Sequence, residues 1–147
     1  MYLLDSQQVM DLFSRDQTRQ IFRWLNTAQP GRTEMFVSVL SLGQIAGAIE
    51  DMDAVPRNHW RRLYQEGRRI FDDAGGIIDV DGAIVDVWQA NLRGNRLSDI
   101  PGADDQLGED DRLIFATAIA RGYALVTEAS PILSAIAQRT TLTTIEL

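Results

Sequence analysis

Acidic side chains stand at points of the sequence where they could bind a cation. Asp5 follows the apolar run 1–4, Glu128 follows the apolar run 123–127, and three acids fill positions 109–111. Carboxylate oxygens are the ligands that hard divalent cations such as Mg²⁺ prefer. Whether these acids can share an ion depends on the secondary-structure elements that position them.

The pattern of apolar residues predicts strands alternating with helices. Short apolar, β-rich runs predict strands, and helical spacing with start signals at Ser41 and Pro56 predicts helices. Expected strands are 1–4, 35–40, 123–127 and 142–145, with a short extended piece at 77–78; expected helices are 18–27, capped by Asp16 or Thr18, then 42–51, 57–72, 81–93, 113–120 and 131–138. Residues 94–110 are expected to form an irregular surface loop. This alternation favours a single α/β domain over residues 1–147.

A mainly parallel sheet would bring the acids to one edge. In open α/β sheets, sites lie in the crevice outside the carboxyl ends of the strands. Asp5 and Glu128 are therefore both expected at that edge.

Three segments in order resemble the PIN-domain family, and its VapC toxin branch in particular. They are MYLLDSQQVMDLF near the start, VSVLSLGQIAGAIE in the middle and DRLIFATAIARGYALVTEA near the end. The resemblance runs over the whole chain and implies a PIN-like three-layer α/β/α fold with a mainly parallel central sheet. It also implies Mg²⁺- or Mn²⁺-dependent hydrolysis of RNA, a cognate antitoxin and a homodimer.

The resemblance assigns catalytic positions to Asp5, Ser6, Gln44 and Asp111, and metal binding to Asp5 and Asp111. Glu128, four residues before the position of the family's fourth acid, is expected to substitute for that acid in part as a metal ligand. The match is incomplete, because Gln44 stands where the family has a glutamate and Ile132 where it has its fourth acid. Further departures are Ser6 for threonine, Gln7 for asparagine and Ala129 for asparagine.

The missing acids predict weakened or lost catalysis. Gln44 offers an oxygen but no negative charge, and one charge 4 Å from another contributes about 4 kcal/mol at an effective dielectric of about 20. Weak or absent binding of Mg²⁺ or Mn²⁺ is therefore expected. Because Glu→Gln is isosteric, a natural and an introduced origin of Gln44 both remain open, although Ile132 favours natural divergence.

Other interpretations of the same residues remain open. Asp5 could cap the turn after its strand, acids 109–111 suit any helix N-terminus, Gln44 could lie in close helix packing, and Glu128 could be a solvated loop acid. The arginines of helix 57–72 could contact phosphate or form a solvated face. The alternative function is a non-catalytic, PIN-derived module that binds RNA or a protein.

Two unrelated α/β classes are disfavoured. A receiver-like domain needs a lysine, and all 14 basic residues here are arginine. A flavodoxin-like domain needs a phosphate-binding loop after its first strand, which DSQQVMD is not.

Composition sets broader limits. The net charge of -7 gives no general attraction to nucleic acid, and the absence of cysteine excludes disulfides and thiolate metal sites. No apolar run is long enough to span a membrane, and the first residues do not resemble a signal peptide. A cytoplasmic protein is therefore expected.

Overall fold

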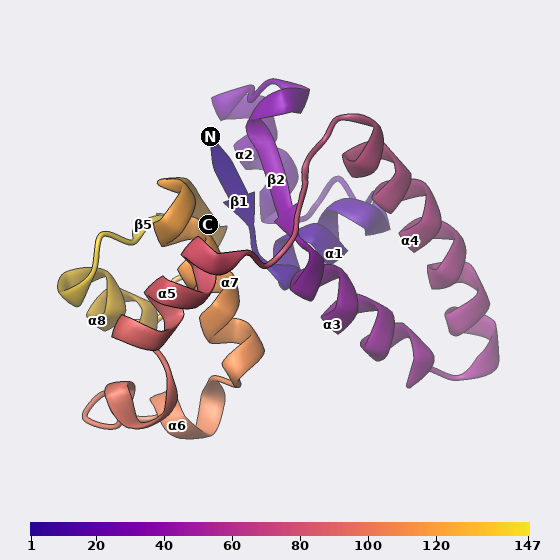
Figure 1. Cartoon of the computed structure of the whole chain (residues 1–147). Coiled ribbons are helices and arrows are strands. Elements are labelled where there is room, and N and C mark those ends of the chain that lie inside the picture. Colours follow the sequence, from indigo (N-terminus) through magenta and orange to yellow (C-terminus); the bar gives the residue numbers. More distant parts are fainter.

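The computed structural model describes residues 1–147 and contains one five-stranded, wholly parallel sheet in the order β3-β2-β1-β4-β5 (Figure 1). The strands are β1 Tyr2–Leu4, β2 Met35–Ser38, β3 Ile77–Ile78, β4 Ala124–Thr127 and β5 Thr143–Glu146. The helices are α1 Ser6–Ser14, α2 Gln20–Ala28, α3 Val39–Glu50, α4 Ala54–Asp73, α5 Gly82–Asn91, α6 Ala103–Gln106, α7 Glu109–Arg121 and α8 Pro131–Arg139, with 3₁₀ turns η1 Arg32–Glu34 and η2 Gly94–Leu97. The predicted three-layer α/β/α architecture with a parallel sheet is confirmed.

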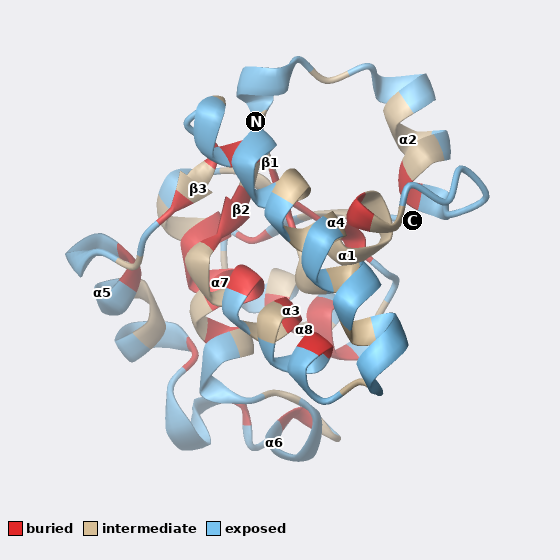
Figure 2. Cartoon of the chain, turned by 90° about the vertical axis from the view of Figure 1, so that its right-hand side faces the viewer, coloured by how far each residue is buried: buried red, intermediate tan, exposed pale blue.

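Alternating side chains of the strands form two cores, one on each face of the sheet. Leu4 and Val126 point to the layer that contains α1, α3 and α4, and their neighbours Leu3 and Leu125 point to the layer that contains α5, α7 and α8. Successive residues of a strand face opposite sides, and strands of a parallel sheet are buried on both faces. Figure 2 shows this burial concentrated on the sheet and α7, while the outer side of α4 is exposed.

Two predicted helix starts are wrong. Ser38, not Ser41, caps α3 by accepting a hydrogen bond from the Leu40 N–H at 3.1 Å, because β2 ends two residues earlier than predicted. Ser41 is buried inside the helix, and its hydroxyl has no partner. Asp16 and Thr18 bond to each other in the turn before α2, which therefore has no side-chain cap.

The segment 94–110 is more ordered than predicted. It contains η2 and the single turn α6, and α7 already begins at Glu109, four residues before the predicted helix. α4 begins at Ala54, so Pro56 lies within its first turn, where a missing N–H leaves no helical bond unmade. None of the helices combines the length and the apolar character that crossing a membrane would need.

Candidate functional site

The carboxyl ends of β1 and β4 bring Asp5 and Thr127 to the same edge of the sheet. The two strands pair in parallel with Leu4 opposite Val126, and the Asp5 N–H continues the ladder by donating to the Val126 carbonyl at 3.1 Å. Asp5 also caps α1, since its carboxylate accepts from the Gln8 N–H at 2.9 Å. The turn-capping interpretation of Asp5 and its position at the strand edge are thus both correct.

A cavity of about 240 Å³ opens at this edge. It gathers all four residues that the resemblance marked as catalytic, from the N-termini of α1 and α7 and from the middle of α3. The lining residues are Asp5, Ser6, Gln7, Gln44, Gln106, Leu107, Asp111, Ile114, Phe115, Thr127 and Leu133. The geometry brings the candidates together, and their catalytic role stays a prediction.

Gln44 lies at the centre of the polar contacts in this cavity. Its Nε2 donates to Asp111 Oδ1 at 2.9 Å and to Asp110 Oδ2 at 2.6 Å. Its Oε1 accepts a hydrogen bond from the Ser6 hydroxyl. The side chain therefore links α1, α3 and α7, which excludes the interpretation of Gln44 as mere close helix packing.

Asp111 has a donor at each carboxylate oxygen. Oδ1 accepts from Gln44, and Oδ2 accepts from the Gly108 N–H at 2.9 Å, an N-terminal capping contact of α7. The general rule that acids favour helix N-termini therefore holds for Asp111 as well as for Asp110. The same residue caps the helix and lines the cavity.

Burial raises the pKa of Asp5 above its ordinary value of 3.8. The Thr127 side chain and the Gln8 N–H oppose this shift by stabilising the carboxylate, whereas the nearby negative charge of Glu128 reinforces it. Desolvation is the largest of these causes, because a buried carboxylate loses the water that stabilises its charge.

Glu128 does not line the cavity. It is exposed and borders a separate polar hollow of about 470 Å³ with Gln8, Asp11, Asp16, Thr18, Arg19 and Gln20. Ile132 is a residue of α8 and packs into the apolar core, and Ala129 is exposed in the segment before that helix.

The side chains that could act as metal ligands do not fit a tight Mg²⁺ or Mn²⁺ site. Such ions need several converging oxygen ligands, but nowhere do three or more acids and histidines come close enough to hold a metal ion. Gln44 moreover directs its N–H group, not its oxygen, at Asp111. The assignment of Asp5, Asp111 and Glu128 as metal ligands stays a prediction that this geometry does not favour.

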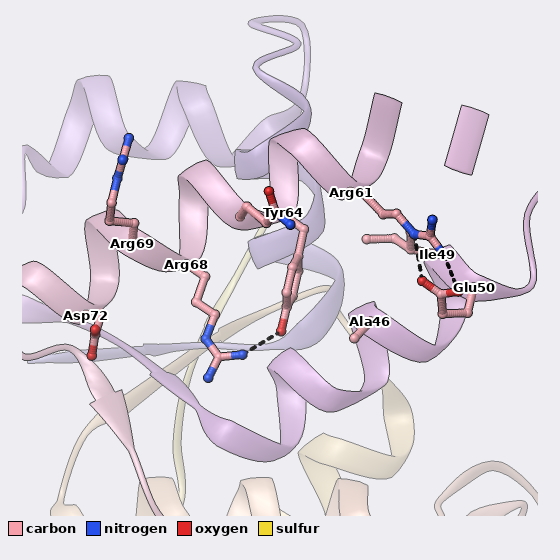
Figure 3. A pocket seen from close by; sticks show the side chains of 9 residues that line it. Ala46, Ile49, Glu50, Arg61, Tyr64, Arg68, Arg69 and Asp72 are labelled. Atoms are coloured by element: carbon pink, nitrogen blue, oxygen red, sulfur yellow. Dashed lines mark hydrogen bonds and ion pairs between the residues drawn. The ribbon is translucent and has the colours of Figure 1, made fainter. Parts of the chain in front are cut away.

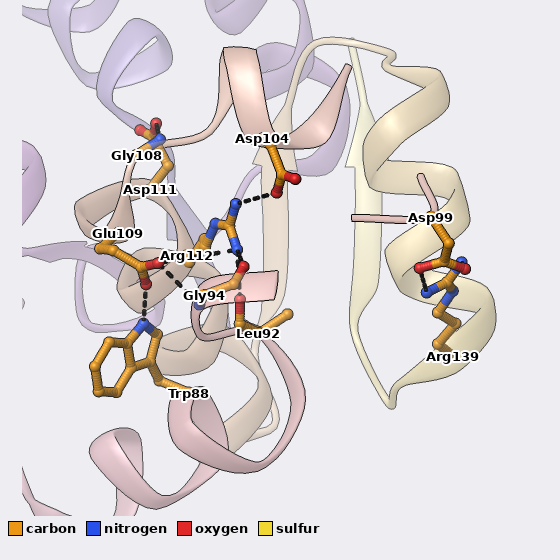
Figure 4. Close-up of polar contacts among 10 residues, drawn as sticks. All are labelled: Trp88, Leu92, Gly94, Asp99, Asp104, Gly108, Glu109, Asp111, Arg112 and Arg139. Carbon is orange, nitrogen blue, oxygen red and sulfur yellow. Dashed lines mark hydrogen bonds and ion pairs between the residues drawn. The ribbon is translucent and has the colours of Figure 1, made fainter. Parts of the chain in front are cut away.

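The buried Arg112 fixes the loop that forms one wall of the cavity. Its guanidinium is 3% exposed and donates to the carbonyls of Leu92 at 2.8 Å and Gly94 at 2.6 Å, and to Asp104 at 3.2 Å (Figure 4). One turn earlier, Glu109 accepts from Trp88 Nε1 at 2.6 Å and from the Gly94 N–H at 3.0 Å. These contacts tie the end of α5, η2 and α6 to α7.

The largest cavity lies elsewhere, in a groove of about 520 Å³ between α3 and α4 (Figure 3). It is lined by Ala46, Ile49, Glu50, Arg61, Tyr64, Gln65, Arg68, Arg69 and Asp72. Arg61 pairs with Glu50 across one end, and Arg68 donates weakly to the Tyr64 hydroxyl at 3.4 Å. The groove offers no ordered set of acids or nucleophiles.

Sequence reasoning missed two polar residues that line the strand-edge cavity, Thr127 and Gln106, and one that contacts its Gln44, Asp110. Thr127 ends β4 and could have been found by the same edge argument that placed Asp5. Asp110 was assigned only to helix capping, and Gln106 fell in the segment expected to be an irregular loop. No sequence signal indicated that Gln44 would contact both aspartates.

The fold is similar to that of solved toxin–antitoxin complexes. No family model matches the sequence, and no curated protein matches it. The chain aligns over 99% of its length with 97% of a chain of FitAcB from Neisseria gonorrhoeae, at 17% identity and a TM-score of 0.73. It aligns over 99% of its length with 98% of a chain of VapBC2 from Rickettsia felis bound to a promoter DNA fragment, at 15% identity and a TM-score of 0.68. It also aligns with a DNA-bound VapBC from Salmonella typhimurium, at 14% identity and a TM-score of 0.70, over 99% of this chain and 96% of that one.

These alignments extend over nearly the full length of both chains, so they concern the whole architecture and not one shared motif. The identities are too low to carry the activity of those proteins across. The chain therefore has the VapC-like PIN fold that the resemblance of its sequence implied.

Proposed function

We propose that this chain is a toxin-like PIN protein that pairs with an antitoxin, and that its RNA-cleaving activity is weak or lost. The alignment with FitAcB and VapBC complexes supports an antitoxin partner. The observation that carries the loss of activity is the Gln44 amide, which occupies the position expected for a glutamate and donates to Asp110 and Asp111. A neutral amide supplies neither the charge nor the basicity of a carboxylate.

The alternative function, a non-catalytic module that binds RNA or a protein, is favoured by the same contact. An ordered network of Ser6, Gln44 and two aspartates gives the cavity a defined structure that needs no bound ion. The two proposals share the fold and differ only in whether any cleavage remains.

Cleavage of a mixed RNA panel in Mn²⁺ separates them. We expect little or no cutting by the unaltered chain and a gain in cutting by the Gln44→Glu variant. Asp5→Asn, combined with Gln44→Glu, should abolish the gain, because it removes a carboxylate from the same cavity. Efficient cutting by the unaltered chain that Asp5→Asn abolishes would contradict the weakened site. Silence of both the unaltered chain and the Gln44→Glu variant would favour the binding module.

A mostly apolar cavity of about 260 Å³, separate from the three described above, supports a protein partner. It lies between α1 and α4 and is mostly apolar, lined by Leu12, Phe13, Met35, Leu63, Gly67, Ile70 and Phe71 with Arg15 and Arg32 at its rim. Ile70 is 58% exposed there. Exposed apolar patches next to polar rims commonly mark protein interfaces, and we propose that the antitoxin binds here.

Ile70→Asp tests this surface, with Val85→Asp as its matched control, because Val85 is an exposed apolar residue on α5. A protein that co-purifies with the chain in fixed stoichiometry from its native host provides the partner. We expect Ile70→Asp to weaken its binding at least about tenfold and Val85→Asp to leave it unchanged. Equal effects would exclude the apolar cavity as the docking surface. Light scattering on the same samples tests the homodimer that the resemblance implies.

A further inference from the structure

We propose that Gln44 is an internal substitute for a cation: its amide holds the two carboxylates of α7 together, so that the cavity is complete without a divalent metal ion. This inference deepens the proposed function by stating why the cavity has lost its metal chemistry. It does not depend on an antitoxin or on any residual cleavage.

The first support is the number of donors that the amide provides. A primary amide has two N–H groups, and the Gln44 Nε2 atom contacts one oxygen of each carboxylate, at 2.6 Å for Asp110 and 2.9 Å for Asp111. Two carboxylates on adjacent residues repel one another, and hydrogen bonds to ionised groups are about twice as strong as neutral ones. The amide thus offsets a repulsion that a bound cation would otherwise offset.

The second support is the orientation of the amide. Its Oε1 atom accepts from the Ser6 hydroxyl, so the Ser6 proton and the two carboxylates together select one of the two amide orientations. The reversed amide would oppose its oxygen to Asp110 and Asp111, which have no proton to donate when ionised. Ser6 therefore acts as a positioning residue for the Gln44 amide.

The third support is that both carboxylate oxygens of Asp111 already accept hydrogen bonds. One of its oxygens accepts from Gln44 and the other from the Gly108 N–H. A cation that approached Asp111 in the cavity would meet the N–H group of Gln44, whose positive end already faces this carboxylate. The remaining acid of the cavity, Asp5, lies between β1 and α1 and not on α7, and makes no group of three acids with them.

Substitutions at Gln44 test the proposal through metal binding and stability, with no need for activity. Binding of Mn²⁺ is followed by electron paramagnetic resonance, and the melting temperature is measured with and without Mn²⁺. We expect no saturable Mn²⁺ binding at the cavity of the unaltered chain and no shift of its melting temperature.

Gln44→Glu should lower the melting temperature in the absence of metal, because a third carboxylate then faces Asp110 and Asp111. Added Mn²⁺ should restore the melting temperature and bind saturably, in contrast to the unaltered chain, because the added negative charge attracts the cation at this range. Gln44→Met removes the amide without adding charge and should also make the melting temperature respond to Mn²⁺.

Gln106→Met is the matched control, because Gln106 lines the same cavity but makes no side-chain hydrogen bond to either aspartate. The Gln106→Met variant should have a melting temperature that does not change on addition of Mn²⁺, as in the unaltered chain. Tight Mn²⁺ binding by the unaltered chain that Asp5→Asn abolishes would overturn the proposal, as would a Gln44→Met variant that is indifferent to Mn²⁺. Neither result bears on antitoxin binding at α1 and α4, so failure of this inference and failure of the proposed function are distinguishable.

Discussion

The strand-edge cavity and the α3–α4 groove differ in size and in order, and the smaller one is the better ordered. The groove measures about 520 Å³ and the cavity about 240 Å³. In the cavity, Ser6, Gln44 and Asp111 hold one another across three helices. In the groove, the exposed side chains of Arg61 and Glu50 pair between α4 and α3, and Arg68 has only a 3.4 Å contact to Tyr64 within its own helix.

The position of a cavity in the sheet topology, and not its volume, therefore indicates the candidate site. The cavity lies where parallel strands end and where the N-termini of α1 and α7 meet, the usual place for sites in such sheets. The groove is a gap between two antiparallel helices whose outer side chains are solvated. Its walls could change without disturbing the cavity, because Gln44 and the groove residue Ala46 lie on opposite faces of α3.

The largest contrast should come from two arginines, one beside each region. Arg112→Met leaves the carbonyls of Leu92 and Gly94 without their buried donor, and we expect it to lower the free energy of unfolding by about 3 kcal/mol. Arg68→Met in the groove should change it by less than about 0.5 kcal/mol. Urea denaturation measures both, and similar losses would show that the groove is as tightly ordered as the cavity wall.

A second contrast comes from two glycines, one in α4 and one in α3. An alanine at Gly67 would place its Cβ 2.2 Å from the Phe13 ring, so Gly67→Ala should destabilise the protein by about 1–3 kcal/mol through overpacking of α1 on α4. Gly47 in α3 has open space around it, and Gly47→Ala should stabilise the helix by about 0.5–1 kcal/mol. Thermal unfolding measures whether the two variants change stability in opposite directions. Two changes of the same sign would contradict the close packing of α1 on α4.

Asp5 predicts a dependence of stability on pH in the cavity that is opposite in sign to that of Glu50 in the groove, where the Arg61 side chain lowers the pKa of the carboxyl group. Burial raises the pKa of Asp5 in the folded protein above 3.8, so folding favours its protonated form. Its contribution is present in full below the unfolded pKa and is lost as the pH rises through the raised folded pKa. As the pH rises through this acidic range, the unaltered chain should lose this contribution, so the Asp5→Asn variant should become more stable relative to the unaltered chain. Parallel denaturation curves at several pH values would detect it, and a constant difference between the two proteins would contradict the shift.

The smallest effect is expected at the mouth of the groove. Arg61 pairs with Glu50 through two contacts, at 2.9 and 2.7 Å, but both side chains are about half exposed. Exposed ion pairs contribute little and are screened by salt. A double-mutant cycle with Arg61→Met and Glu50→Gln should give a small coupling that disappears at high salt. A large, salt-independent coupling would mean that the groove is more desolvated than its exposure indicates.

Much of the architecture followed from local pattern. The run 1–4, the run 123–127 and the helical spacing between them predicted a parallel sheet, because strands buried on both faces have a continuous apolar sequence. The edge argument then placed Asp5 correctly. It also placed Glu128 directly after β4, but it could not predict that this side chain borders a separate hollow, since the direction of a residue in a loop after a strand depends on the turn that follows.

Helix boundaries showed the limits of local signals. Ser38 and Ser41 are both good caps by residue type, and only the length of β2 in the sheet decided between them. Arg112 carried no signal for burial, because arginine is rarely buried. Its place in the core depends on carbonyls 18 and 20 residues away along the chain.

The sequence by itself determined the order of the elements, the parallel sheet and the shortage of acids at the positions of the family. Periodicity, residue type and the presence of an amide in place of a carboxylate are properties of each position alone. Only the tertiary structure decided that Gln44 would meet Asp110 and Asp111 and that Glu128 would not line the cavity. These contacts join residues separated by 66 and 67 positions, and their geometry is fixed by how α3 and α7 pack on the two faces of the sheet.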